Sequence, residues 1–151
     1  MKFNNLLSKI DVHLLKLLRF GIVLLIIGIP AYPKFPIFSL PGTYVSIRAE
    51  DLLIAVIAFV WVIYIRDKWK ELWNINVIKA AVLFLVVGAI ASLSAIFLTQ
   101  TGKPLQIILH TMRRWEYLVV LPIILSVVKT RKDVLYYMKV VLLTIIIVLI
   151  Y

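Results

Sequence analysis

The chain has no cysteine, only two histidines and few acidic residues, and each shortage excludes a class of chemistry. Without cysteine there can be no disulfide, no thiolate metal site and no cysteine nucleophile. The two histidines, His13 and His110, are too far apart for a paired-histidine metal motif, and the sequence has no HExxH, GxSxG or Walker A pattern. We therefore expect no metal site and no bound cofactor.

Hydrophobic residues dominate what is present. They make up 64% of the 151 residues, whereas soluble domains average about 45–50%. The formal net charge is nevertheless +10, from 17 Lys and Arg against 7 Asp and Glu. This combination is typical of a bacterial inner-membrane protein whose basic loops face the cytoplasm. Nucleic-acid binding is not expected, because the basic residues lie between apolar runs and form no continuous basic face.

The apolar residues fall into five stretches, so we predict an all-α, polytopic transmembrane bundle of about five spans forming one membrane domain. Crossing about 30 Å of hydrocarbon takes about 20 helical residues. The second and fourth stretches are shorter than this and must include flanking charged residues. The fifth is still apolar at Tyr151, so we expect the chain to be the beginning of a larger bundle. The predicted spans are 14–30, 44–65, 75–98, 107–128 and 134–151.

The distribution of Lys and Arg predicts the orientation. Ten lie in the N-terminal segment and in the connections after the second and fourth spans, whereas five lie in the other two connections. The positive-inside rule then places the N-terminus in the cytoplasm and the connections at 31–50 and 99–116 outside. Four prolines, Pro30, Pro33, Pro36 and Pro41, lie in the first outer connection or directly before it, which indicates an extended segment ending in a turn at Pro41-Gly42.

Two charged clusters mark the outer ends of the second and fourth predicted spans. Helical spacing of i,i+3 predicts the ion pairs Arg48–Asp51 and Arg113–Glu116, which leaves Arg114 as an uncompensated cation and turns Glu50 to another face. Because both clusters lie at similar depth, we expect a cationic, outward-facing pocket. Arginine suits phosphate, which it binds in a bidentate geometry. The alternative is that these residues simply lie in the outer headgroup region.

The motifs around these clusters resemble a known family, the O-antigen ligase-like membrane proteins. The first outer connection and second span carry Tyr32-Pro33-Lys34-Phe35-Pro36, Leu40-Pro41-Gly42-Thr43-Tyr44-Val45 and Ile47-Arg48-Ala49-Glu50-Asp51-Leu52-Leu53-Ile54-Ala55. The fourth span carries Arg113-Arg114-Trp115-Glu116-Tyr117-Leu118, which is similar to the RRxEY start of a later helix in that family. The resemblance covers roughly residues 14–130.

The resemblance implies a membrane glycosyltransferase that moves a glycan from an undecaprenyl-pyrophosphate carrier to a lipid acceptor at the outer face of the inner membrane. It implies that Arg48, Arg113 and Arg114 bind the pyrophosphate, supported by Asp51 and Glu116, without a metal. The family's catalytic histidine lies in a later loop that has no counterpart here, so no catalytic residue is assigned and His110 does not take that role. This fragment alone is not expected to be an active enzyme.

Three other interpretations stay open. A polysaccharide polymerase of the same class would carry the same features. A transporter or flippase fragment would use the charges to line a substrate path, although such charges belong near the bilayer midplane, whereas here they gather at one leaflet. A small membrane subunit without catalytic function would need no site.

Overall fold

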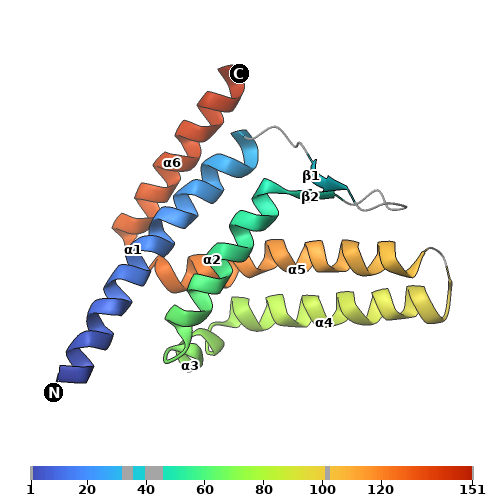
Figure 1. Ribbon diagram of the computed structural model, residues 1–151, viewed down its shortest axis with the longest axis horizontal. Helices are drawn as coiled ribbons and strands as arrows, with labels where there is room; N and C mark the ends of the chain where they lie inside the picture. Colours follow the sequence, from blue (N-terminus) through green and yellow to red (C-terminus); the bar gives the residue numbers. More distant parts are fainter. Residues whose placement is uncertain (1, 32–35, 40–45, 101–102, 151) are drawn as a thin grey trace.

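The structure, a computed structural model, describes residues 2–31, 36–39, 46–100 and 103–150. The described residues form six helices and one two-stranded sheet (Figure 1). The elements are α1 (Lys2–Ala31), β1 (Pro36–Ser39), β2 (Ser46–Arg48), α2 (Ala49–Ile65), α3 (Trp69–Trp73), α4 (Asn76–Phe97), α5 (Pro104–Val127) and α6 (Arg131–Ile150). The predicted all-α class is therefore confirmed.

The helices form two groups. In the first, α1 and α6 lie side by side and α2 packs on the other side of α1 (Figure 1). In the second, α4 and α5 form a long antiparallel hairpin that extends away from the first group. The last part of α5 joins the two groups, because it packs against both α1 and α2.

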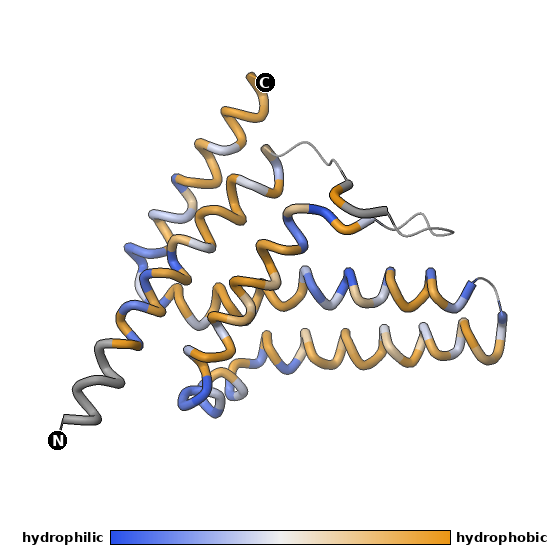
Figure 2. The backbone as a smooth tube through the Cα atoms, in the orientation of Figure 1, coloured by the Kyte–Doolittle hydropathy of each residue, from blue (hydrophilic) through white to orange (hydrophobic). Residues whose placement is uncertain are grey.

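Within the described part of the chain, three helices are long and apolar enough to cross a membrane: Ile10–Ala31 within α1, Asn76–Phe97 and Arg131–Ile150. Apolar residues cover most of their length in Figure 2, while hydrophilic residues gather near helix ends and along part of α5. The 17 residues of α2 reach about 26 Å at ~1.5 Å per residue, somewhat less than the hydrocarbon thickness. α5 is long enough but carries the charged cluster.

The second predicted span was wrong at its start. Residues 44–45 lie outside the described part of the chain, and Ser46–Arg48 form strand β2 rather than helix. β2 pairs antiparallel with β1, and the partners include Phe38 with Ile47 and Ser39 with Ser46. The connection between α1 and α2 is therefore extended at Pro36–Ser39 and Ser46–Arg48, as its prolines predicted, whereas Pro30 lies inside α1. The turn predicted at Pro41-Gly42 lies outside the described residues.

The core lies where α1, α2 and α5 meet. Its most deeply buried side chains are Leu18 and Ile22 of α1, Ile54 of α2, and Ile123 and Val127 of α5. Gly21 allows α1 and α2 to approach closely, because a Cβ there would lie 2.9 Å from Ile57 Cγ1. Small residues serve the same purpose in many membrane helix pairs.

Local signals set the start of α6. The Thr130 hydroxyl accepts a hydrogen bond from the backbone N–H of Asp133 at 3.1 Å, and the Asp133 carboxylate accepts one from the N–H of Thr130 at 3.1 Å. This reciprocal arrangement is a capping box, which satisfies two otherwise free N–H groups at the helix start. It also turns the chain directly from α5 into α6.

Candidate functional site

The two charged clusters meet in space. β2 leads into α2 at Arg48, and the first turn of α2 carries Glu50 and Asp51. The middle of α5 carries Arg113 and Glu116, and it packs beside this first turn. We call these five residues, with Tyr117, the hairpin-end cluster, because they lie at the end of α2 that follows the antiparallel β1–β2 pair. The two charged groups, 62 positions apart at Asp51 and Arg113, therefore form a single cluster.

Arg113 joins three elements. Its Nη2 donates to the backbone carbonyl oxygen of Ser46 at 2.6 Å and lies 3.4 Å from Asp51 Oδ2. The same Asp51 oxygen accepts a hydrogen bond from the backbone N–H of Arg48 at 2.9 Å. One guanidinium thus ties α5 to strand β2 and to the first turn of α2.

Glu50 is the buried carboxylate of the cluster, with 5% of the residue exposed. Its Oε1 accepts a hydrogen bond from the Tyr117 hydroxyl at 3.1 Å and lies 3.3 Å from Arg48 Nη1. A buried carboxylate is costly unless it is paired and hydrogen-bonded. Tyr117 and Arg48 supply those partners, and Tyr117 adds a second link between α5 and α2.

The predicted ion pairs were therefore wrong in their partners. Arg48 pairs with Glu50 instead of Asp51, and Arg113 pairs with Asp51 instead of Glu116. The Asp51 carboxylate accepts a hydrogen bond from the N–H of Arg48, as the third residue of a helix often does at its cap. This conformation places the carboxylate beside Arg113. Glu116 is half-buried and forms no ion pair with any described residue.

Charge in the cluster is nearly balanced. Arg48 and Arg113 face three carboxylates, those of Glu50, Asp51 and Glu116, and the neighbouring Arg114 brings the count to three of each sign. Arg114 is exposed and forms no ion pair within the described part of the chain, as predicted. The site is thus a paired polar cluster with one free arginine beside it.

Three buried atoms of the cluster have no hydrogen-bond partner among the described residues: Arg48 Nε, Glu50 Oε2 and Asp51 Oδ1. Buried polar atoms in folded proteins are almost always hydrogen-bonded, so each such atom needs an explanation. One donor and two acceptors leave the cluster able to hold further polar groups. Water molecules or the polar part of a ligand would satisfy them.

Sequence reasoning missed two participants, Tyr117 and the Ser46 carbonyl. Tyr117 directly follows Glu116 in the motif that resembles RRxEY, so the motif itself was the available signal. The role of Ser46 depends on the pairing of β2 with β1, which no helical spacing could indicate. His110 is exposed, and no described residue contacts its side chain through a hydrogen bond or ion pair.

Polar contacts also define the opposite end of the bundle, where α3 lies. Lys68 Nζ lies 3.1 Å from Asp11 Oδ2, and Arg19 Nη2 lies 3.2 Å from Asp133 Oδ1. These pairs bring the N-terminal segment, the α2–α3 connection and the start of α6 to one end. The sequence assigned these same three segments to one side of the membrane.

A buried hydrogen bond connects α2 and α5 near the α3 end, away from the hairpin-end cluster. Trp61 Nε1 donates to Ser126 Oγ at 2.9 Å, and the Ser126 hydroxyl donates to the carbonyl oxygen of Ile123 at 2.8 Å. Both side chains are buried. Together with the hairpin-end cluster, this bond fixes the register of α5 along α2.

Comparison of the chain with protein-family models, with curated proteins and with solved structures finds no match.

Proposed function

We propose that this chain is the N-terminal part of a membrane glycosyltransferase that resembles O-antigen ligase. The enzyme would transfer a glycan from an undecaprenyl-pyrophosphate carrier to a lipid acceptor at the outer face of the bacterial inner membrane. In this proposal the N-terminus and α3 face the cytoplasm, the β-hairpin faces outward, and α2 and α5 cross the membrane beside the three long apolar helices.

One observation carries the proposal. The two motifs that resemble this family lie 62 residues apart at Asp51 and Arg113, and they are in direct contact. Tyr117 and Glu50 provide a second contact between the same motifs. Unrelated interfacial charges have no reason to bury a carboxylate between two helices, whereas a preorganised headgroup site does.

The arginines would then have different roles. Arg114 is free to bind a pyrophosphate oxygen without breaking an existing pair. Arg48 and Arg113 hold carboxylates, and the unpaired Arg48 Nε offers a further donor. Because pyrophosphate carries more charge than a single carboxylate, it can compete with Asp51 and Glu50 for these guanidinium groups.

A polysaccharide polymerase would use the same site on the same carrier. A transporter or flippase fragment is less well supported, because the described ion pairs gather at the two ends of the bundle rather than along its middle.

The test is carrier binding by the purified full chain in nanodiscs. Undecaprenyl pyrophosphate should bind more tightly than undecaprenol, which lacks the phosphates. Arg114→Ala should weaken carrier binding about tenfold, and adding Arg113→Ala should weaken it further, since each charged hydrogen bond contributes about 1.5–3 kcal/mol.

Two exposed cations serve as controls, Lys103 at the start of α5 and Arg66 at the end of α2. Lys103→Ala and Arg66→Ala should leave carrier binding unchanged. Equal binding of the carrier to wild type and to the double arginine variant would refute the proposed site.

A further inference from the structure

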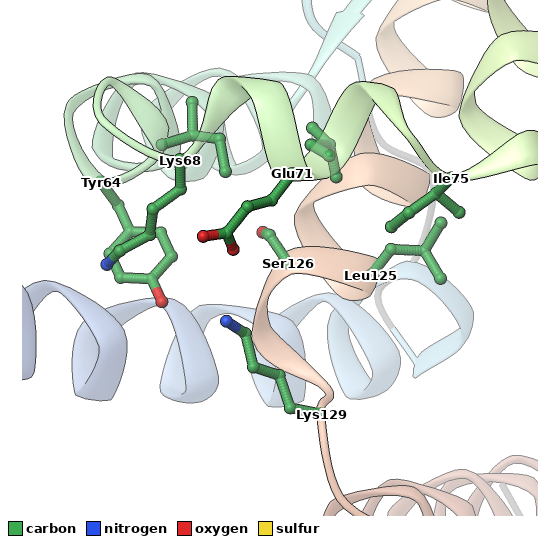
Figure 3. A pocket seen from close by; sticks show the side chains of 9 residues that line it. Tyr64, Lys68, Glu71, Ile75, Leu125, Ser126 and Lys129 are labelled. Atoms are coloured by element: carbon green, nitrogen blue, oxygen red, sulfur yellow. The ribbon is translucent and has the colours of Figure 1, made fainter.

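A small cavity lies at the α3 end of the bundle, away from the hairpin-end cluster. It has a volume of about 80 Å³ and opens between the α2–α3 connection and the end of α5 (Figure 3). Its apolar wall includes Leu72, Ile75 and Leu125. A single water needs about 10–15 Å³ of such volume, so the cavity accommodates several water-sized groups.

The mouth of this α3 pocket carries side chains of both charges. Glu71 projects from α3 and Lys129 rises from the end of α5 toward the same space (Figure 3). Both residues are exposed, and neither side chain forms an ion pair or hydrogen bond within the described part of the chain. A free carboxylate and a free ammonium therefore border one small cavity.

Lys68, the other cation at the mouth, is already engaged. Its ammonium is bonded to Asp11 and lies 4.1 Å from the centre of the Tyr64 ring. Partial burial lowers the pKa of Lys68, but the interactions with Asp11 and Tyr64 outweigh this effect and raise its pKa above 10.5. Lys68 thus stays charged and keeps its partners, so Glu71 and Lys129 remain the groups available to a ligand.

The surroundings identify a membrane interface. Trp69 and Trp73 on α3 are about half exposed and stack on each other with ring centres 6.4 Å apart. Exposed tryptophans are enriched where lipid headgroups meet the hydrocarbon. A lipid headgroup at the level of these tryptophans is placed to enter the α3 pocket, with its glycerol beside the apolar wall.

We propose that the α3 pocket binds the headgroup of a zwitterionic aminophospholipid, with the primary ammonium on Glu71 and the phosphate on Lys129. A phosphoethanolamine group carries these two charges a few bonds apart, so it can meet both side chains at once. The phosphate of an anionic phospholipid would pair with Lys129, but its headgroup has no ammonium for Glu71 and would be repelled by that carboxylate. A choline headgroup has no N–H to donate to the carboxylate.

The experiment measures lipid binding to the purified full chain in detergent by native mass spectrometry. Phosphatidylethanolamine, phosphatidylcholine and phosphatidylglycerol with identical acyl chains are titrated separately. The expected preference for phosphatidylethanolamine is about fivefold to tenfold, the effect of one charged hydrogen bond at a partly exposed site. Glu71→Gln should abolish the preference, whereas Lys129→Gln should weaken binding of all three lipids.

Lys70→Gln is the matched control, because Lys70 is an exposed lysine on α3 that does not line the pocket, and it should change nothing. Circular dichroism checks that each variant keeps its helices. Equal binding of the three lipids would overturn the proposal, as would a phosphatidylglycerol preference that Glu71→Gln strengthens. If Glu71 and Lys129 only form a surface ion pair with each other, their substitutions would show coupled effects on thermal stability and would not change the lipid preference. This result would also refute the proposal.

Discussion

Replacing Arg113 with methionine removes the guanidinium that joins α5 to α2 and β2, while most of the side-chain volume stays. The Asp51 carboxylate then still accepts the hydrogen bond from the N–H of Arg48 but loses its cation. The Ser46 carbonyl loses the guanidinium that donates to it at 2.6 Å. The perturbation therefore tests whether this contact stabilises the hairpin-end cluster.

The structure bounds the size of the effect. Breaking a fully buried ion pair costs about 3–5 kcal/mol, whereas exposed pairs contribute about 0–1 kcal/mol. The side chains of Arg113 and Asp51 are 23% and 12% exposed, which lies between these limits. We expect Arg113→Met to lower the free energy of unfolding by about 2 kcal/mol.

The assay is unfolding in mixed micelles by titration with dodecyl sulfate, followed by circular dichroism. Arg114→Met is the matched control, since it removes an adjacent arginine that is exposed, and it should stay within about 0.5 kcal/mol of wild type. Adding Asp51→Asn to Arg113→Met should cost little more, because the unpaired charge is then gone. Equal effects of the two arginine variants, or additive effects in the double variant, would refute the reasoning.

Two further predictions test the helix packing and the orientation. Gly21→Ala should destabilise the chain by about 1–2 kcal/mol because its Cβ would overlap Ile57, whereas Gly88→Ala, which meets nothing within 4 Å, should be neutral or stabilising in the same unfolding assay. If both alanines behave alike, close α1–α2 packing is not what Gly21 provides. Since the chain has no cysteine, single cysteines can report the orientation. A cysteine that replaces Lys103 should react with an impermeant maleimide added to intact cells, and one that replaces Lys70 should not. The reverse labelling pattern would invert the proposed orientation.

Hydrophobic runs predicted the helices because a helix in lipid needs only length and apolar side chains. The apolar stretches found at residues 75–98 and 134–151 correspond to α4 and α6, with differences of one to three residues at the described ends. α1 begins earlier than predicted, at Lys2, because charged residues continue a helix without hindrance once it leaves the apolar region. The five-residue α3 was missed, since a single helical turn has no periodicity to detect.

The start of α2 could not be predicted from hydropathy. Extending the second span backward assumed that Ser46–Arg48 continue the helix, but these residues hydrogen-bond to β1 instead. Strand pairing depends on a partner that lies several residues earlier in the chain. Because Glu50 and Asp51 occupy the first turn, their carboxylates also favour a helix that begins at Ala49.

The ion pairs of the site show the limit of helical spacing. Spacing gives the side chains that can meet along one helix, and it predicted Arg48–Asp51 and Arg113–Glu116. Contacts between helices determine two of the observed partners instead, because packing α5 on α2 places Arg113 beside Asp51 and Tyr117 beside Glu50. The charged residue types were correctly singled out. The pair Arg48–Glu50 is local, but Arg113–Asp51 and Tyr117–Glu50 depend on the relative rotation of two helices, which spacing along one helix cannot predict.

The contact between α1 and α6 has a consequence for how the chain is made. Arg19 and Asp133 lie 114 positions apart, so α1 is synthesised long before its partner helix. During this interval the side of α1 that α6 later covers remains open to lipid or to the insertion machinery. A chain that stops before Arg131 would leave that side of α1 uncovered, because the packing partner that covers it in the structure is α6.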